Sequence, residues 1–348
     1  MKKILVTGGV GFIGSHTCIS LLEKGYKLIV LDSNINSHKE VLTRIKLISE
    51  LKGINKIDLT FEKGDIRNQK FLEKIFSREL ILEDPIEGVI HFAGLKSLSE
   101  SIQKPLLYWE NNVMGSLNLF KTMERFDCRT LVFSSSASIY GISSGAPILE
   151  NSLINPTNPY GQTKVAVENI LKDIFQSSNK EWSIANLRYF NPIGAHETGL
   201  IGESPLCTPN NLFPSICRVA KGIDKKLKIY GNDWETPDGT CIRDYIHVMD
   251  LADAHISALD YLANNEPQII NINIGTGKGT SVLELINKFN EINECKVSFE
   301  FCRRRQGDAA IVIADNKKAI STLNWEPKRK IGQMCKDGWK WQMSSYIS

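Results

Sequence analysis

The feature that most constrains the fold is a cluster of glycines close to the start of the chain. Gly8, Gly11 and Gly14 follow the apolar run ILV and precede a helical stretch. Because glycine has no Cβ, such a turn can tighten and let the backbone approach a pyrophosphate at the positive end of the helix. A plain glycine turn is the alternative. The strand–turn–helix order favours the first unit of a dinucleotide-binding domain.

An acidic residue at the end of the second expected strand supports this interpretation. Asp32 follows Gly14 at close to the ~20 residues typical of an acid that binds the ribose 2′-hydroxyl. A carboxylate there would repel a 2′-phosphate, so NAD is favoured over NADP. The segment 91–96 ends a later strand, and we expect it to line the nicotinamide side.

Short apolar runs alternate with helix-length stretches through the first half of the chain. Strands are predicted at 3–7, 27–32, 59–62, 88–92, 130–134 and 183–189, and helices at 11–24, 68–76, 112–126 and 159–176. Continuous Val, Ile and Leu runs fit strands that are buried on both faces. The predicted fold class is therefore α/β, a Rossmann-type doubly wound parallel sheet.

The composition and the hydrophobic pattern of the sequence change after Asn191. Residues 194–214 and 231–242 are rich in Gly, Pro, Asn and Thr, and helical patterns return at 249–264 and 281–292. A chain of 348 residues holds one large domain or two intimate ones. We expect a cofactor domain at 1–190 and a smaller, loop-rich substrate domain at 191–348, some segments of which return to the first.

Composition excludes several other classes of protein. The chain is 42% hydrophobic and 23% charged with a net charge of +3, which is ordinary for a globular protein and lacks the basic surplus of a nucleic-acid binder. No apolar run reaches the ~18–20 residues that cross a bilayer. The eight cysteines form no CxxC pair. We expect reduced thiols in a cytoplasmic protein without a metal site.

A tyrosine and a lysine one helical turn apart carry the strongest chemical signal. Asn158 and Pro159 suit a helix start, so Tyr160 and Lys164 would share one face of that helix. An adjacent ammonium and the positive nicotinamide ring of NAD would favour the phenolate over the free phenol, whose pKa is ~10, and make it a general base. For a lone Tyr-x-x-x-Lys, a surface tyrosine and a solvated lysine are the ordinary alternative.

Three serines close the fifth predicted strand, at the edge where parallel sheets hold their ligands. A hydroxyl among Ser134, Ser135 and Ser136 could bond the reacting oxygen and relay its proton to Tyr160. Capping a helix is the simpler alternative for such a run.

Together these motifs resemble the extended short-chain dehydrogenase/reductase superfamily, and longer strings resemble its UDP-glucose 4-epimerases, the galactose epimerases. Those strings are HFAGLK (91–96), QKPLLYWENN (103–112), RYFNPIGAH (188–196), NNLFP (210–214), RDYIHVMDLADAH (243–255) and RRQGD (304–308). The resemblance runs from residue 1 to about 342 with almost no insertions.

The resemblance implies a set of site residues. Ser136, Tyr160 and Lys164 form the implied catalytic set. The implied NAD-binding residues are Gly8, Gly11, Phe12, Ile13, Gly14, Asp32, Asn36, Ser37, Asp65, Ile66, Phe92, Ala93, Gly94, Lys96, Asn111, Tyr160, Lys164 and Phe190. The implied UDP-sugar-binding residues are Lys96, Ser136, Tyr160, Asn191, Asn211, Leu212, Lys228, Ile229, Tyr230, Arg243, Val312, Arg305 and Asp308. Guanidinium groups such as those of Arg243 and Arg305 suit a diphosphate, whereas we expect Arg303 to be solvated.

The implied reaction inverts C4 of a UDP-linked hexose through transient oxidation to a 4-keto sugar with tightly bound NAD. UDP-glucose and UDP-galactose would interconvert. Family members differ at a pocket wall four residues past the RRQGD aspartate, which is Val312 here. A tyrosine there would fill the space, whereas valine leaves room for a 2-acetamido group, so we also expect UDP-N-acetylglucosamine and UDP-N-acetylgalactosamine as substrates. The family further implies a homodimer packed through 112–126 and 159–176.

Three alternatives remain. A sugar-nucleotide 4,6-dehydratase needs an acid pair after the strand-five serine, but Ala137 and Ser138 follow Ser136 here. A uronate epimerase would need a cation for the 6-carboxylate, and no clear extra cation is visible. A non-catalytic NAD-sensing protein would not need Ser136, Tyr160 and Lys164 together.

Overall fold

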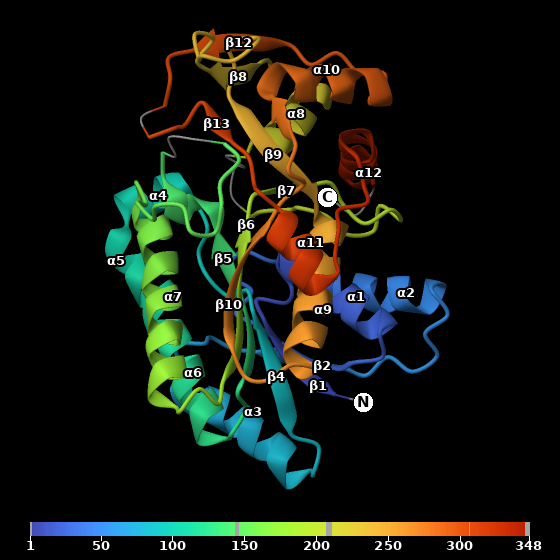
Figure 1. Cartoon of the computed structure of the whole chain (residues 1–348). Helices are drawn as coiled ribbons and strands as arrows, with labels where there is room; N and C mark the ends of the chain where they lie inside the picture. Colours follow the sequence, from blue (N-terminus) through green and yellow to red (C-terminus); the bar gives the residue numbers. More distant parts are fainter. Residues whose placement is uncertain (1, 143–145, 207–210, 306, 345–348) are drawn as a thin grey trace.

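The large sheet of the computed structural model is parallel and has seven strands, in the order β10-β6-β5-β4-β1-β2-β3 (Figure 1). The model describes residues 2–142, 146–206, 211–305 and 307–344. The strands of this sheet are β1 Lys3–Thr7, β2 Lys27–Asp32, β3 Leu59–Lys63, β4 Ile86–His91, β5 Thr130–Ser136, β6 Ser183–Tyr189 and β10 Ile269–Ile274. The predicted Rossmann-type parallel sheet is confirmed.

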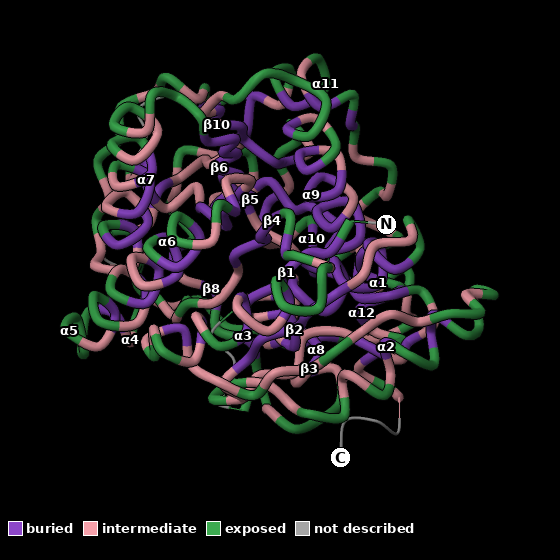
Figure 2. Tube along the Cα trace, turned by 90° about the horizontal axis from the view of Figure 1, so that it is seen from below, coloured by how far each residue is buried: buried purple, intermediate pink, exposed green. Residues whose placement is uncertain are grey.

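Helices cover both faces of this sheet, and the buried strands lie between them (Figure 2). One face carries α1 Phe12–Glu23, α2 Glu40–Leu51, α9 Val248–Ala263 and α11 Lys317–Leu323; the other carries α3 Gln69–Ile81, α6 Gly115–Arg125 and α7 Pro159–Ser177. Strand β1 has the sequence KILVT and is buried along its whole length. Burial on both faces explains why these strands read as continuous apolar runs.

A smaller unit built from the second half of the chain lies over the carboxyl ends of the large sheet (Figure 1). Its strands are β7 Asn191–Ile193, β8 Leu227–Tyr230, β9 Ile242–His247, β11 Gly279–Ser281, β12 Phe299–Cys302 and β13 Ile311–Val312, and its helices are α8 Leu212–Ala220, α10 Val282–Asn293 and α12 Ile331–Met343. Three segments of the second half pack with the large sheet instead: β10 pairs with β6, and α9 and α11 cover one face.

A local signal marks the start of α7, whereas two other helices differ from the expectation. The Asn158 side chain accepts a hydrogen bond from the Gly161 N–H at 2.8 Å, and α7 begins at Pro159 as predicted. The helix expected over 112–126 instead begins with the π-helical segment η1 Trp109–Met114 and continues as α6. Helix α8 begins at Leu212, inside the stretch 194–214 that the composition marks as loop-rich, and it has Pro214 in its first turn, where proline is tolerated.

The structure also bears on membrane-spanning helices and on disulfide bonds. None of the helices in the described ranges is both long and apolar enough to cross a membrane. The seven cysteines among the described residues are free, and the eighth, Cys207, lies outside them.

Candidate active site

The glycine turn between β1 and α1 fits the approach of a phosphate group. Gly8 has a φ of +68°, and a Cβ there would lie 2.7 Å from the backbone N of Ala93. A Cβ at Gly14 would lie 2.3 Å from the carbonyl oxygen of Gly8. Helix α1 begins directly at Phe12 and Ile13 with no side chain capping its first N–H groups. These donors, at the positive end of the helix, suit a pyrophosphate.

Asp32 ends β2 beside this turn and is buried. Its carboxylate accepts hydrogen bonds from the Val10 N–H at 3.1 Å, the Asn34 N–H at 2.8 Å and the Ser37 hydroxyl at 3.0 Å. The acid thereby joins the glycine turn to the loop after β2. In the same loop, the Asn36 side chain accepts the Leu206 N–H at 3.0 Å.

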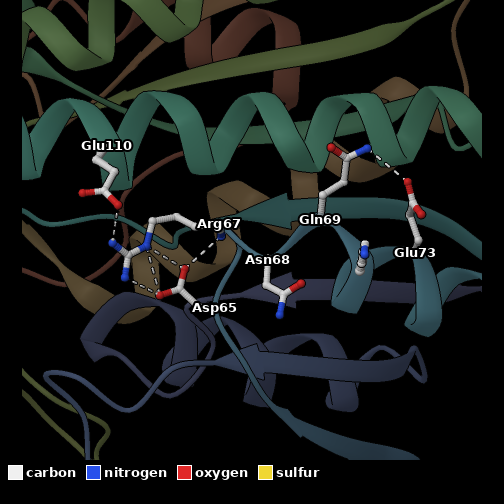
Figure 3. A pocket seen from close by; sticks show the side chains of 7 residues that line it. Asp65, Arg67, Asn68, Gln69, Glu73 and Glu110 are labelled. Carbon is white, nitrogen blue, oxygen red and sulfur yellow. Dashed lines mark hydrogen bonds and ion pairs between the residues drawn. The ribbon is translucent and has the colours of Figure 1, made fainter.

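A shallow polar pocket opens after β3 (Figure 3). Its lining residues are Asp65, Arg67, Asn68, Gln69, Lys70, Glu73 and Glu110. The Arg67 guanidinium donates to Asp65 at 2.7 Å and to Glu110 at 3.0 Å, and this pairing holds the pKa of Asp65 below its usual value. Ile66 is buried against Gly115, where a Cβ would lie 2.6 Å from its Cδ1. Arg67 is not among the residues expected at the site from the sequence.

A buried asparagine, Asn112, anchors the segment after β4. The Asn112 side chain accepts the Leu95 N–H at 2.8 Å and donates to the Leu95 carbonyl at 3.0 Å and to the Thr163 hydroxyl at 3.1 Å. A Cβ at Gly94 would lie 3.2 Å from Asn112 Oδ1. Asn112 belongs to the π-helical turn η1, a feature frequent at functional sites. The neighbouring Asn111 instead donates to the Leu107 carbonyl at 2.8 Å.

Ser136, Tyr160 and Lys164 come together at the carboxyl edge of the large sheet. Ser136 ends β5, and the other two lie in the first turns of α7, which packs beside β5. The Lys164 Nζ lies 5.8 Å from the centre of the Tyr160 ring and donates to the Ser134 carbonyl at 2.7 Å. The Ser136 hydroxyl interacts with Tyr160 and donates to the Ser138 hydroxyl at 3.1 Å.

Burial and neighbouring charges change the pKa values of Tyr160 and Lys164, and one of these charges comes from another loop. Burial raises the pKa of Tyr160, whereas the Ser136 hydroxyl and the positive charge of Lys96 lower it. Burial lowers the pKa of Lys164 to about 8, and the negative charge of Glu168 opposes that fall. Lys164 lies near Tyr160, as helical spacing predicts. Lys96, distant in sequence, brings a second positive charge that lowers the pKa of the phenol. Spacing along one helix carries no information about a cation from another loop.

A glutamate that the sequence analysis missed joins two of the expected ligand residues. Glu203 Oε1 lies 2.8 Å from Lys96 Nζ and 3.2 Å from Asn211 Nδ2. Asn211 directly precedes Leu212, the first residue of α8. Glu203 therefore links the loop after β4 to the start of α8. It lies in an irregular stretch, where periodicity gives no signal.

The remaining expected substrate residues lie in the smaller unit. Arg305 stacks on Tyr230, with its guanidinium carbon 3.7 Å from the ring centre. Within β8, Ile229 is buried in the core and Lys228 is exposed, so their side chains point to opposite sides of the strand. Arg303 is exposed, consistent with a solvated cation.

Strand pairing brings three other members of this set to neighbouring positions. Arg243 in β9 pairs with Val312 in β13, and its guanidinium donates to the Ile242 carbonyl at 2.9 Å. Asn191 begins β7, which pairs with the next part of β9 and places Asn191 opposite Tyr245. Asp308 lies outside the strands, four residues before Val312.

An apolar cluster joins the two units next to Ser136. Phe190 is buried there with Ile139 and Tyr140, and Ala137 and Val312 pack against the cluster. Val312 thus lies in the same cluster as Ala137, the residue after Ser136. Phe92, an expected NAD-binding residue, lies elsewhere and packs its ring against His255, with ring centres 4.7 Å apart.

Comparisons with known proteins agree with this arrangement. The family model described as GDP-mannose 4,6 dehydratase matches residues 5–338. The chain is 48% identical to UDP-glucose 4-epimerase 2 of Arabidopsis thaliana, over 98% of this chain and 95% of that protein. It is 47% identical to UDP-glucose 4-epimerase of Bacillus subtilis, over 98% and 97% of the two chains.

Solved structures give the same result. UDP-glucose 4-epimerase from Bifidobacterium longum, in complex with NAD+ and UDP, is 40% identical, covers 99% of both chains and superposes with a TM-score of 0.91. The UDP-Glc/GlcNAc 4-epimerase from Campylobacter jejuni is 33% identical, covers 98% of this chain and 99% of its own, and has a TM-score of 0.83. The chain therefore belongs to the extended short-chain dehydrogenases/reductases of the GDP-mannose 4,6 dehydratase type and, within them, to the UDP-glucose 4-epimerase family.

Proposed function

We propose that the chain is an NAD-dependent UDP-hexose 4-epimerase that interconverts UDP-glucose and UDP-galactose. The observation that carries the proposal is the meeting of Ser136, Tyr160 and Lys164 at the carboxyl edge of a sheet whose first turn fits a pyrophosphate. Full-length identity of 47–48% to UDP-glucose 4-epimerases supports it.

The side chains divide the acid–base work. Tyr160 takes the proton of the sugar 4-hydroxyl and returns it at the end of the reaction. Lys96 and the Ser136 hydroxyl favour its ionised form against the cost of burial. Lys164, held by the Ser134 carbonyl, keeps an ammonium beside the phenol ring. When bound, NAD supplies the hydride acceptor and donor of the reaction.

Binding of the nucleotide part of the substrate falls to the smaller unit. Arg243 and Arg305 carry guanidinium groups that match the oxygens of a diphosphate. Asn191, Asn211 and Asp308 offer amide and carboxylate groups suited to neutral hydroxyls. Firm contacts to UDP with few to the hexose let the oxidised sugar turn, so that the hydride returns to its other face.

The N-acetylated pair is the finer part of the proposal. Val312 packs against the apolar cluster that contains Phe190, as does Ala137, the residue after Ser136, and this supports a role for Val312 near the sugar. Valine occupies much less of this wall than the tyrosine of restricted family members would. The similarity to an enzyme named for both UDP-Glc and GlcNAc supports the wider range.

Dehydratase chemistry finds no support in the residues after Ser136. The segment Ala137–Tyr140 forms a short 3₁₀ helix, η2, in which the Ser138 N–H donates to the Ser136 hydroxyl. An alanine and a serine therefore occupy the positions where elimination of water needs an acid and a base. The match to the family model described as GDP-mannose 4,6 dehydratase therefore reflects shared ancestry and a shared fold.

We also propose that the enzyme is a cytoplasmic homodimer. The apolar side chains of α6 and α7, such as Leu119, Phe120 and Leu171, are already buried in the core. The neighbouring segment formed by α4 Leu98–Gln103, α5 Pro105–Tyr108 and η1 instead exposes large apolar side chains at the outer edge (Figure 1). Those side chains are Leu98, Ile102, Leu106, Trp109 and Met114. We call this surface the α4–η1 face and assign it to a second copy, because isologous contacts cover such faces.

The test is a side-by-side assay of purified protein. UDP-galactose and UDP-N-acetylgalactosamine are supplied separately without added NAD, and both products and the NAD content of the protein are measured. We expect bound NAD and both conversions. Protein that retains NAD but converts neither sugar would contradict the proposed activity and favour the sensing alternative.

A further inference from the structure

Helix α7 presents three polar side chains, each one turn after the last, on the face that meets β5. They are Tyr160, Lys164 and Glu168, at the i, i+4 and i+8 positions. The first two belong to the proposed chemistry, whereas Glu168 has no role in it. Glu168 and Lys164 are both buried, and a charged glutamate is rarely buried unless it is paired.

Each of the three side chains meets one of three consecutive residues at the end of β5. Tyr160 interacts with the Ser136 hydroxyl, and Lys164 donates to the Ser134 carbonyl at 2.7 Å. Glu168 Oε1 accepts the Ser135 hydroxyl at 2.5 Å. The helix and the strand end are therefore joined at 134, 135 and 136 in succession.

The Glu168 carboxylate is also fixed from the opposite side. Arg188 in β6 donates to it through Nε at 3.0 Å and through Nη2 at 2.7 Å, which is a bidentate pair. Arg188 in turn donates to the Tyr140 hydroxyl at 2.9 Å and to the Glu150 carbonyl at 2.8 Å. Both partners are almost fully buried, so the carboxylate has one defined position between α7, β5 and β6.

We propose that Glu168 is a positioning residue for the epimerase reaction: by holding Ser135 against α7 it sets the places of Ser136 and of the Lys164 ammonium. The inference rests on the proposed function, because it concerns the same group of side chains. Ser135 directly precedes Ser136 at the end of β5, so the bond from Ser135 to Glu168 fixes the strand end from which the Ser136 hydroxyl meets Tyr160.

Glu168 also contributes the negative charge that acts on Lys164. The polar and charged groups around Lys164 are Tyr160 and Glu168 on α7, the Ser134 carbonyl on β5 and His91 on β4, with Arg188 of β6 beyond Glu168. Burial lowers the pKa of His91 to about 3, so this ring is neutral at physiological pH. Loss of the Glu168 charge would lower the pKa of Lys164 further, and the ammonium would lose its proton at a lower pH.

The experiment compares two identical substitutions. Glu168→Gln removes the charge at the site, and Glu79→Gln removes it from the buried pair of Glu79 with Lys3 at the opposite end of the sheet. For Glu168→Gln we expect kcat to fall roughly 10- to 100-fold with little change in KM, because the reacting groups are displaced. We also expect the alkaline limb of the kcat profile to move about one pH unit lower.

The control separates positioning from stability. Glu79→Gln should lower the melting temperature but leave the pH profile of kcat in place. A Glu168→Gln profile that superimposes on that of the unchanged enzyme would overturn the proposal, even if kcat is reduced. Inactivity of the unchanged enzyme would instead refute the proposed function, so the two failures are distinguishable.

A second variant covers the case in which Glu168→Gln does not fold. Ser135→Ala keeps the Glu168–Arg188 pair and removes the hydroxyl that joins it to β5. We expect a several-fold lower kcat and an unshifted alkaline limb, because the charge beside Lys164 is retained. An unchanged kcat in Ser135→Ala would show that the bond to β5 positions nothing, and would overturn the proposal.

Discussion

The phenol of Tyr160 lies in surroundings that, by burial alone, oppose the charge its proposed role needs. Burial raises its pKa, and the Ser136 hydroxyl and the Lys96 charge work in the other direction. The Lys96 charge is shared with Glu203, at 2.8 Å. Ionisation of the base therefore depends on side chains from three separate segments of the chain.

Replacement of Tyr160 by Phe tests this residue directly. The variant loses the hydroxyl that exchanges the proton but keeps the ring, so we expect turnover to fall at least about 100-fold while bound NAD remains. Enzyme assay and absorbance of the denatured supernatant measure the two quantities. Tyr261→Phe, in α9 away from the site, is the matched control and should keep full activity. A Tyr160→Phe enzyme of nearly normal rate would contradict the assignment.

Val312 determines substrate range in our proposal. Val312→Tyr should abolish conversion of UDP-N-acetylgalactosamine and keep conversion of UDP-galactose, because the larger ring fills the wall beside Ala137. Initial rates for both sugars, measured on the same preparation, decide the matter. Equal loss of both activities would point to disruption of the apolar cluster, and no effect on either would place the specificity wall elsewhere.

Single-residue predictions from sequence succeeded where the partners are close along the chain. Tyr160 and Lys164 are one helical turn apart, so their proximity follows from helix geometry. Contacts such as Lys96 with Glu203, or Glu168 with Arg188, join residues from different elements. Nothing local in the sequence marks such pairs, since only the assembled sheet brings them together.

Among the elements, the turn between β1 and α1 has no room for a side chain at Gly8 or Gly14. At Gly14 even one added carbon would lie 2.3 Å from the Gly8 carbonyl oxygen. Sequence predicted this turn well, because the glycine pattern reflects a local steric requirement. It did not predict the π-helical turn η1, whose wider hydrogen-bond pattern leaves no distinct periodicity in six residues.

Gly14→Ala should displace this turn. We expect a lower melting temperature and loss of copurified NAD, because the backbone of the turn must move away from the Gly8 carbonyl. Gly332→Ala in α12 is the control: its nearest neighbour would lie 3.6 Å from the new Cβ, and alanine should stabilise the helix by about 0.5–1 kcal/mol. Thermal unfolding and NAD content are measured for both. Normal NAD content in Gly14→Ala would argue against the turn as the phosphate site.

At the scale of the whole molecule, the large sheet and the smaller unit are joined by the apolar cluster around Phe190, next to Ser136. The parallel sheet was predictable because each strand carries its own apolar run. The placement of α9 and β10 on that sheet was not, since their sequences resemble any buried helix or strand. The smaller unit is built from short strands of two to six residues, which carry little pattern.

The exposed apolar side chains of the α4–η1 face predict that two copies of the chain form a dimer through this face. Leu106→Glu places a charge on this face, where Leu106 is 82% exposed in the single chain, and should convert the dimer into monomer. Ile81→Glu, at a residue that is 78% exposed at the end of α3, is the matched control and should leave the dimer intact. Sedimentation velocity measures both. A dimer that persists in Leu106→Glu would exclude this face as the interface.

The return of β10 to the large sheet has a consequence for how the chain is made. Strand β6 ends at Tyr189, but the strand that pairs with its outer edge begins only at Ile269. During synthesis the ribosome must add that whole intervening stretch before β6 finds its partner. Until then β6 is an unpaired edge, the kind of surface to which other nascent chains add strands. The order of the sheet therefore leaves β6 with one unpaired edge until β10 has been synthesised.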